Sequence, residues 1–582
     1  MMRSLCPLWF LALFVVPTSL SAASPEDAKL AAFFDAFLEA RMKFSPSEAT
    51  ALGDHRYDDR LDDLSPAARA KADTHLRTSL EALPAIVEYA KLSRDAQIDF
   101  EILKSALTRQ VWETDNFKPL ENDPRAYNAV ISDSVFLSLT QSTTAKALNV
   151  RNAAARIGYI PRVVEAARKT IGTPPAIFVE TAIRQNRGSI AFYEKGIYEL
   201  TGETPGISEL SAPSKLAVVA LKDYQAFLET EVLPRAKGDW RIGKARFAKK
   251  LEYELDTGIG ADELLAEAAG EAERVRRDMY TIARQMWSAT FPGKPVPPDD
   301  AVGRRQTIQV VLNELAKSTG DPKNLVRDIR GSVEEIKQFI RDKGILTLPE
   351  VDRCDVIEMP EFQRGTAAAY LNPAPPLDTR SRSVYAVSPP PSDWDTRRAN
   401  SFMEEYNPTM LKILTIHEAY PGHYVQLEYG NRHPSKVRRV LYSGVFAEGW
   451  AVYTEQMMLD QGFGKGDLSL RLHQLKWYLR AVTNAILDHK MHCTDMTDGA
   501  ALKMLTEEAF QSEGEAIGKI ARAKLSSCQL STYFAGRTAF YRLRTAVSRE
   551  MGEKFDLKAY HENVLSHGTI SVKYLPELVR RR

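Results

Sequence analysis

Two histidines six positions apart constrain this chain more than any other feature of its sequence. They bound the heptapeptide His417-Glu418-Ala419-Tyr420-Pro421-Gly422-His423. On an uninterrupted α-helix, six residues correspond to a rotation of about 240°, so the two imidazoles would not share a ligand. Pro421 has no N–H to donate to the carbonyl of His417 and its ring crowds that carbonyl, so the helix must open here. Because Gly422 tolerates unusual backbone angles, we predict a two-residue bulge that returns His423 to the side of His417 and leaves Glu418 beside them.

The heptapeptide matches the needs of a catalytic zinc ion. Such an ion takes three protein ligands, commonly two histidines and a glutamate, and keeps one position open for water. In the usual H-E-x-x-H helix, the glutamate beside the first histidine acts as general base. The chain has the same two histidines and adjacent glutamate, with two more residues between the glutamate and the second histidine. We therefore expect His417 and His423 to bind one Zn²⁺ per chain and Glu418 to act as general base.

A segment 25 residues further on contains the candidates for the third ligand. Glu448 and Glu455 are seven positions apart, which is about 20° on a helical wheel, so both carboxylates face the same way. A metal-bound histidine usually donates its second N–H to a carboxylate or carbonyl. We expect Glu448 to be the ligand and Glu455 to be the second-shell partner of His417 or His423. The reverse assignment of the two glutamates remains open.

The first 23 residues have the sequence pattern of a secretory signal peptide. Arg3 precedes an apolar run over residues 5–16, and small residues follow up to Ala23, where we expect cleavage. The run is shorter than the roughly 20 residues that span a bilayer. Cys6 lies early in the run and not beside the cleavage site, so no lipoprotein anchor is indicated. We expect an exported protein, periplasmic or extracellular, without a stable membrane anchor.

Charge and cysteine content narrow the possible partners. The formal net charge is +1, and acidic and basic residues are interleaved along the chain. No basic face for nucleic acid is therefore evident. Beyond the signal peptide, Cys354, Cys493 and Cys528 show no C-x-x-C spacing, which argues against a disulfide framework and a cysteine zinc site. The remaining histidines that we interpret as structural or surface residues are His55, His75, His433, His473, His489 and His492.

Helical periodicity dominates the chain. Apolar residues recur at three- and four-residue spacing over residues 29–44, 66–90, 93–112, 259–286, 307–317 and 324–343. Ser24-Pro25 and Ser65-Pro66 have the residues of helix starts. Residues 383–387, which precede Pro389-Pro390-Pro391, predict an edge strand. The fold class is therefore mainly α with a small β-sheet upstream of the heptapeptide.

The same pattern suggests a division of the chain. We expect a signal peptide at 1–23, an N-terminal helical region at 24–290, a helical and then proline-rich segment at 291–395, and a zinc-binding helical region at 396–582. The proline-rich loop 292–298 marks the expected boundary between lobes. Residues 24–582 are expected to form one continuous domain with two lobes.

These motifs resemble a bacterial family known as domain of unknown function 885, which is grouped with the zincin-like metallopeptidases. Residues 415–426, 448–455, 533–536 and 565–568 carry the resemblance, together with the helical N-terminal half and residues 370–373. It implies a large multi-helix zincin-like fold with a deep channel and the sheet beside the active site. It also implies His417, His423 and Glu448 as zinc ligands, and a late tyrosine or histidine as oxyanion donor. Tyr533 and His567 are the candidates for that role. The alternatives are that Tyr533 is a core tyrosine and that His567 is a helix-terminal histidine.

The expected function is that of an exported zinc metallopeptidase acting on small or extended peptides. A zinc-dependent amidase or esterase with a non-peptide substrate would use the same residues. A binding protein without activity is a third possibility, which the presence of Glu418 disfavours. The strand around Tyr385 is a candidate for binding substrate backbone by strand addition, and Arg537 and Arg544 for binding a substrate carboxylate; each also has a plain structural interpretation. Substrate length, exo- or endo-cleavage and oligomeric state are left open.

Overall fold

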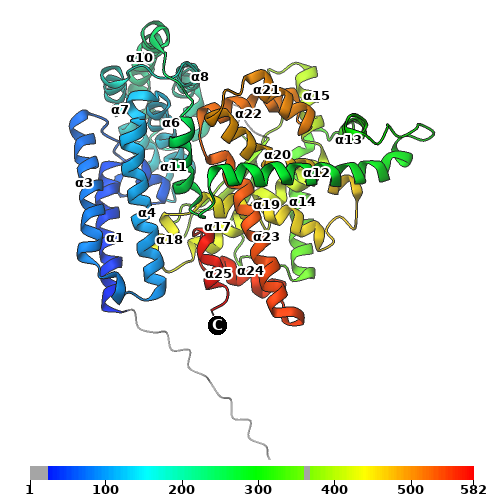
Figure 1. The fold of residues 1–582 in the computed structure, drawn as a ribbon. Helices are drawn as coiled ribbons and strands as arrows, with labels where there is room; N and C mark the ends of the chain where they lie inside the picture. Colours follow the sequence, from blue (N-terminus) through cyan, green and yellow to red (C-terminus); the bar gives the residue numbers. More distant parts are fainter. Residues whose placement is uncertain (1–23, 360–367, 582) are drawn as a thin grey trace, which may run out of the picture.

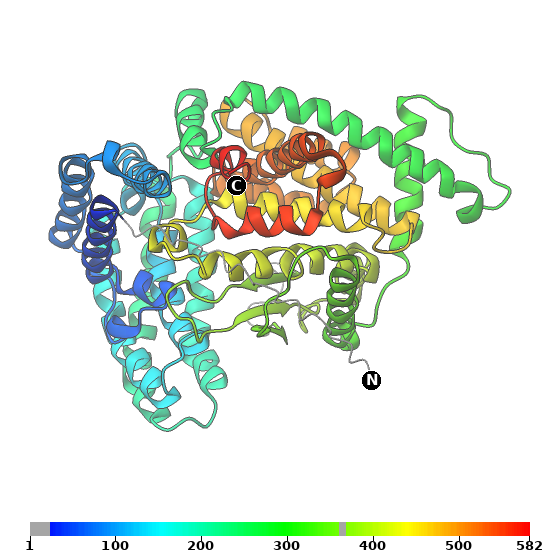
Figure 2. The same cartoon turned by 90° about the horizontal axis from the view of Figure 1, so that it is seen from below.

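The computed structural model describes residues 24–359 and 368–581, so the expected signal peptide at 1–23 lies outside the described residues. The fold is mainly helical with one small sheet. Helices α1 to α10 form one body, and the later helices form a second body around the sheet (Figure 1). Figure 2 shows the two bodies side by side from below. No helix in the described ranges is long and apolar enough to cross a membrane.

The first body is built from the helices expected in the N-terminal half. Ser24 caps α1 by accepting the N–H of Asp27, and Ser65 caps α3 by accepting the N–H of Ala68, so both predicted helix starts are confirmed. Buried apolar residues form two adjoining cores, one within α1–α4 and one mainly within α6–α10. The helices are α1 (Pro25–Phe44), α2 (Pro46–Leu52), α3 (Pro66–Ile86), α4 (Arg94–Phe117), α5 (Pro119–Asn122), α6 (Arg125–Thr140), α7 (Lys146–Thr170), α8 (Ala176–Ala191), α9 (Ile197–Thr201) and α10 (Ser211–Phe227).

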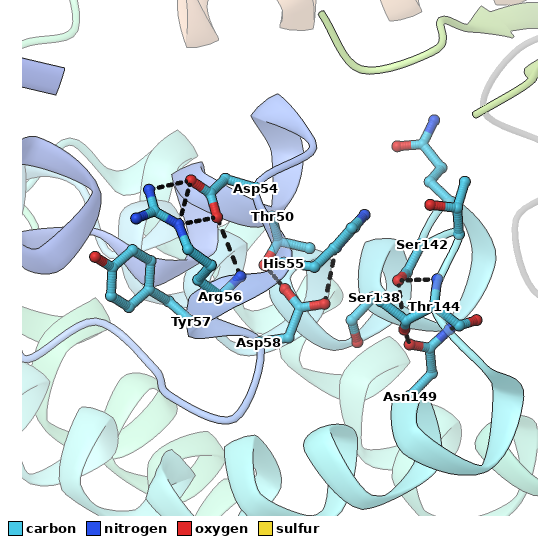
Figure 3. A network of polar contacts seen from close by, with 12 residues as sticks. Thr50, Asp54, His55, Arg56, Tyr57, Asp58, Ser138, Ser142, Thr144 and Asn149 are labelled. Atoms are coloured by element: carbon cyan, nitrogen blue, oxygen red, sulfur yellow. Dashed lines mark hydrogen bonds and ion pairs between the residues drawn. The ribbon is translucent and has the colours of Figure 1, made fainter. Parts of the chain in front are cut away.

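A buried polar network stabilises the first body where α2 meets α7 (Figure 3). The hydroxyl of Thr50 donates to Asp58 at 2.5 Å, and Nδ1 of His55 lies 2.9 Å from the same carboxylate. The fully buried guanidinium of Arg156 donates to Thr50 at 2.5 Å. Nε2 of His55 also lies 3.4 Å from Asp378, which precedes the last strand of the sheet. His55 is thus a structural residue that connects the first body to the second.

The second body has one continuous core that extends from Ile98 and Phe247 to Val579. Its α12 packs along α20, and α19 packs against α23. Residues of α11 and α12 also belong to this core. The helices are α11 (Gly243–Leu255), α12 (Ala261–Thr290), α13 (Ala301–Ala316), α14 (Leu325–Lys343), α15 (Thr396–Glu405), α16 (Pro408–Glu418), α17 (His423–Asn431), α18 (Lys436–Val440), α19 (Gly444–Asp460), α20 (Leu468–Cys493), α21 (Asp498–Lys503), α22 (Glu513–Leu525), α23 (Thr532–Met551), α24 (Leu557–Ser566) and α25 (Leu575–Leu578).

The sheet has three strands in the order β1-β3-β2, namely β1 (Cys354–Glu358), β3 (Ser383–Val387) and β2 (Ala369–Asn372). β1 is parallel and β2 antiparallel to β3. The prediction that β3 is an edge strand is therefore wrong. Pro389, Pro390 and Pro391 suggested an edge, but they follow the last paired residue, Val387, and so remove no donor from the ladder. Strand addition at Tyr385 is excluded as well, because both edges of β3 are occupied.

Candidate metal centre

The heptapeptide forms a turn between two helices. α16 ends at Glu418, α17 begins at His423, and the Tyr420–Pro421 peptide bond between them is cis. The predicted bulge within one helix is therefore corrected to a helix that stops and starts again. Pro421 cannot continue the ladder because it has no N–H; the next N–H, that of Gly422, donates to the carbonyl of Ile416 at 3.1 Å.

Close packing of the backbone requires glycine at position 422. A Cβ atom there would lie 1.9 Å from the carbonyl oxygen of His417 and 2.3 Å from that of Ile416. The turn is also bonded to α19, since the indole N–H of Trp450 donates to the carbonyl of Pro421 at 2.9 Å. Trp450 itself is fully buried. The chain path between the two histidines is therefore fixed by contacts on both sides.

This turn brings His417 and His423 together with Glu448 of α19. Each residue offers one ligand atom, and these atoms all lie within 4.8 Å of one another. Oε2 of Glu448 lies 3.8 Å from Nε2 of His417 and 3.4 Å from Nε2 of His423. The two imidazole rings are nearly perpendicular, at 88°. Two ring nitrogens and one carboxylate oxygen thus converge from three helices.

Glu455 lies one layer behind this cluster. Its Oε1 is 2.7 Å from Nδ1 of His417, and its side chain is fully buried. Burial, followed by repulsion from His423, lowers the pKa of His417 to about 3, so the ring is neutral and donates one N–H. The tautomer with its N–H on Nδ1 donates to Glu455 and leaves Nε2 of His417 free on the side of Glu448. The geometry favours Glu448 as the ligand and Glu455 as the residue that orients His417.

Glu418 lies beside the cluster, between the sheet and a cavity. One of its oxygens accepts the N–H of Leu371 at 3.1 Å, so the free edge of β2 faces this carboxylate. Burial raises the pKa of Glu418 to about 7, with repulsion from Glu448 adding to the rise and His423 opposing it. A carboxylate with a pKa near neutrality can both accept and return a proton.

The donor set fits a zinc ion. Zinc prefers imidazole nitrogen and carboxylate oxygen, with three protein ligands where a position is kept for water. Oε2 of Glu448 is buried and forms no hydrogen bond with any described residue, which is costly unless a cation completes its coordination. A carboxylate behind a ligating histidine, as Glu455 lies behind His417, is the usual outer partner.

The cavity beside Glu418 has a volume of about 550 Å³, within the range of small-molecule and peptide sites. His417, Glu418 and Tyr533 line it, with Ala369 of β2. The hydroxyl of Tyr533 accepts a hydrogen bond from Arg522 at 3.0 Å. Burial and the nearby Glu448 raise the pKa of Tyr533 to about 12, so the phenol keeps its proton at neutral pH. Tyr533 therefore offers a hydrogen-bond donor at the cavity wall.

Other candidate residues lie elsewhere. His567 is not among the described residues that line the cavity; its Nε2 lies 3.0 Å from Asn563, and its carbonyl accepts from Arg438. Its proposed role as oxyanion donor is therefore not supported by its position. The guanidinium of Arg537 is buried between the rings of Tyr478 and Tyr541.

Arg544 is also outside the cavity lining and approaches the ring of Tyr453. Neither Arg537 nor Arg544 is placed to meet a substrate at the centre. Sequence reasoning instead missed the polar residues of α20 and α22 that form the opposite wall, including Arg480 and Lys519. In the sequence these residues form a polar stripe at helical spacing. Such a stripe ordinarily indicates a solvent-exposed helix face, so it did not mark a cavity wall.

Fold and site together define a mainly helical protein with a small sheet and a His–His–Glu cluster beside a large cavity. The chain belongs to the family DUF885, described as bacterial protein of unknown function, whose sequence pattern matches residues 46–579. A solved structure of a candidate lipoprotein of unknown function from Shewanella oneidensis is similar, with 30% identity, a TM-score of 0.80, and coverage of 95% of this chain and 100% of that one.

A candidate lipoprotein from Colwellia psychrerythraea shares the fold at 18% identity, with a TM-score of 0.76 and coverage of 95% of this chain and 98% of that one. A search of curated proteins finds no match. The similarity therefore extends over the whole described chain and establishes the family and the fold.

Proposed function

We propose that this protein is an exported zinc-dependent hydrolase of the zincin-like type, and specifically a metallopeptidase. The observation that carries the proposal is the convergence of His417, His423 and Glu448 within 4.8 Å, with Glu418 beside them at the cavity wall. Three ligands, an adjacent base and an open cavity are the parts that metal-assisted hydrolysis needs.

The mechanism assigns one task to each side chain. Zinc held by His417, His423 and Glu448 would supply Lewis acidity and lower the pKa of water. Glu418 takes a proton from the attacking water and returns it to the leaving amine, a role that suits its pKa of about 7. Tyr533 donates a hydrogen bond to the substrate carbonyl oxygen as negative charge develops there.

The open edge of β2 supports a peptide as substrate. Among the described residues, β2 pairs with β3 alone, and on the other side of β2 the N–H of Leu371 donates to Glu418. Ala369, two residues earlier, faces the same edge and lines the cavity. An extended peptide added along this edge would place its backbone beside Glu418. Strand addition thus moves from β3, where it was expected, to β2.

Export is supported by the N-terminal pattern and by the neighbours. Residues 1–23 have the order of a signal peptide. Both similar structures are described as candidate lipoproteins. We propose a periplasmic or extracellular location for the mature chain.

The test uses purified mature protein and a mixed peptide library. Wild type is expected to contain one zinc per chain, to cleave peptides, and to lose cleavage when a chelator removes the metal. Glu418→Gln keeps the shape but not the base, so it should retain zinc while cleavage falls by roughly 10²–10⁴-fold. Equal cleavage by Glu418→Gln, or a wild type without stoichiometric metal, would contradict the proposal.

A further inference from the structure

The cavity wall formed by α20 and α22 carries more positive than negative charge. Arg480 of α20 is paired with Glu515 at 2.8 Å. Lys519 of α22 forms no hydrogen bond or ion pair of its own with any described residue, although it lines the cavity. Arg522, one turn further along α22, donates only to the neutral side chains of Gln529 and Tyr533. Among the described residues, neither cation forms an ion pair within 4 Å, although Glu515 and Glu448 lie near enough to attract Lys519.

The burial of Lys519 makes this arrangement costly. The residue is only 5% exposed, and an unpaired ammonium group in such a place is strongly disfavoured. Burial, with repulsion from Arg480 and Arg522, lowers the pKa of Lys519 well below its ordinary value. An anion bound in the cavity would remove the cost by pairing with the ammonium group.

An independent observation comes from Asn484 on the opposite helix of this wall. Asn484 is 3% exposed and lines the same cavity. Its Oδ1 is buried and has no hydrogen-bond partner in the described structure. It follows Arg480 by four residues, so the two side chains share a face of α20. Buried amides are normally satisfied, and an amide oxygen accepts hydrogen bonds, which indicates that an N–H or O–H group of a ligand completes this site.

We propose that Lys519 and Arg522 bind the C-terminal carboxylate of a peptide and that Oδ1 of Asn484 accepts the N–H of its last residue, so that the protein cleaves peptides close to their carboxyl end. The inference rests on the proposed peptidase function, since the same cavity contains Glu418. A carboxylate is the anion that every unmodified peptide offers. Its pairing with Lys519 and Arg522 fixes one end of the substrate, while the β2 edge holds the backbone.

Three N-acetylated tetrapeptides test the proposal: tetra-alanine with a free carboxylate, the same peptide as carboxamide, and a carboxamide whose last residue is glutamate. Wild type should cleave the free acid with kcat/KM about 10- to 100-fold above both carboxamides, the range expected for hydrogen bonds to a charged group. Mass spectrometry should show cleavage near the carboxyl end. Equal rates for the acid and the plain carboxamide, or equal rates for the acid and the glutamate carboxamide, would overturn it.

Lys519→Met keeps the side-chain volume and removes the charge. Its preference for the free acid over the carboxamide, taken as the ratio of the two kcat/KM values, should be lost. Its melting temperature should stay level or rise, because an unpaired buried charge is lost; a lower melting temperature with unchanged preference would indicate a structural role and refute the proposal. Lys524→Met is the matched control on the same helix, since Lys524 pairs with Asp498 at 2.6 Å and does not line the cavity; it should keep the preference.

Equilibrium binding separates this inference from the proposed function. Calorimetry with Glu418→Gln should show tighter binding of the acid than of the carboxamide by about 10- to 100-fold, and Lys519→Met added to Glu418→Gln should abolish the difference. If wild type cleaves no peptide but this difference is present, the peptidase proposal fails and the carboxylate site stands. If peptides are cleaved and the difference is absent, the carboxylate site fails alone.

Discussion

Replacing Gly422 by alanine tests whether the turn between the histidines fixes the metal centre. The added Cβ would lie 1.9 Å from the oxygen of His417, about 1.5 Å inside an ordinary contact distance. Both nearest groups are backbone carbonyls, so no side-chain rotation relieves the contact and the turn itself must move. Overpacking of this kind costs about 1–3 kcal/mol. Zinc ligands must hold their distances within about 0.2 Å, so a shift near 1 Å separates His423 from His417.

The assay is competition for zinc with a chelating dye, followed by thermal melting of the same samples. Gly422→Ala should bind zinc more weakly than wild type by at least the roughly 10- to 100-fold seen when an outer partner of a metal ligand is lost. Gly270→Ala is the control, because an added Cβ at this exposed helical position meets nothing within 4 Å. It should stabilise the fold by about 0.4–1 kcal/mol and leave zinc binding unchanged. Unchanged zinc affinity in Gly422→Ala would refute the reasoning.

Three further predictions concern single side chains. Glu455→Gln, which weakens the bond to Nδ1 of His417, should reduce zinc affinity by about 10- to 100-fold in the same dye assay; a wild-type affinity would contradict its supporting role. Tyr533→Phe should lower kcat by about 10²–10³-fold with zinc content unchanged, and a full kcat would remove Tyr533 from the mechanism. His567→Gln should leave peptide cleavage within twofold of wild type, as roughly expected for a position outside the cavity; a large loss would reinstate it.

Local features of the sequence predicted much of the fold and the cluster. The helices over residues 29–44 and 324–343 follow from apolar spacing and caps, which act within a few turns. The convergence of His417 and His423 could be predicted because Pro421 forbids the continuous helix that would separate them. The pairing of Glu455 with His417 followed from its helical phase relative to Glu448.

Features that depend on distant segments could not be predicted. Whether β3 is central depends on its pairing with two other strands. The prolines just beyond its last paired residue suggested an edge strand, although they lie outside the paired residues. The sequence between α16 and α17 is compatible with a bulge as well as with a stop. The contact that holds the turn, a hydrogen bond from Trp450 to the carbonyl of Pro421, comes from a distant helix and cannot be read from the sequence. His567 stands in a family-like motif, yet the packing of α24 directs it toward Asn563. The burial of Lys519 depends on the packing of α22 against α20, which the sequence does not show.

An anomalous-scattering map at the zinc edge, from crystals of the protein grown with zinc, tests the metal centre most directly. We predict a single strong peak per chain, about 2.0–2.1 Å from Nε2 of His417 and of His423 and about 2.0–2.2 Å from a carboxylate oxygen of Glu448. Glu455 should remain bonded to Nδ1 of His417 and outside the coordination sphere. A peak elsewhere, or none at this cluster under saturating zinc, would contradict the central claim.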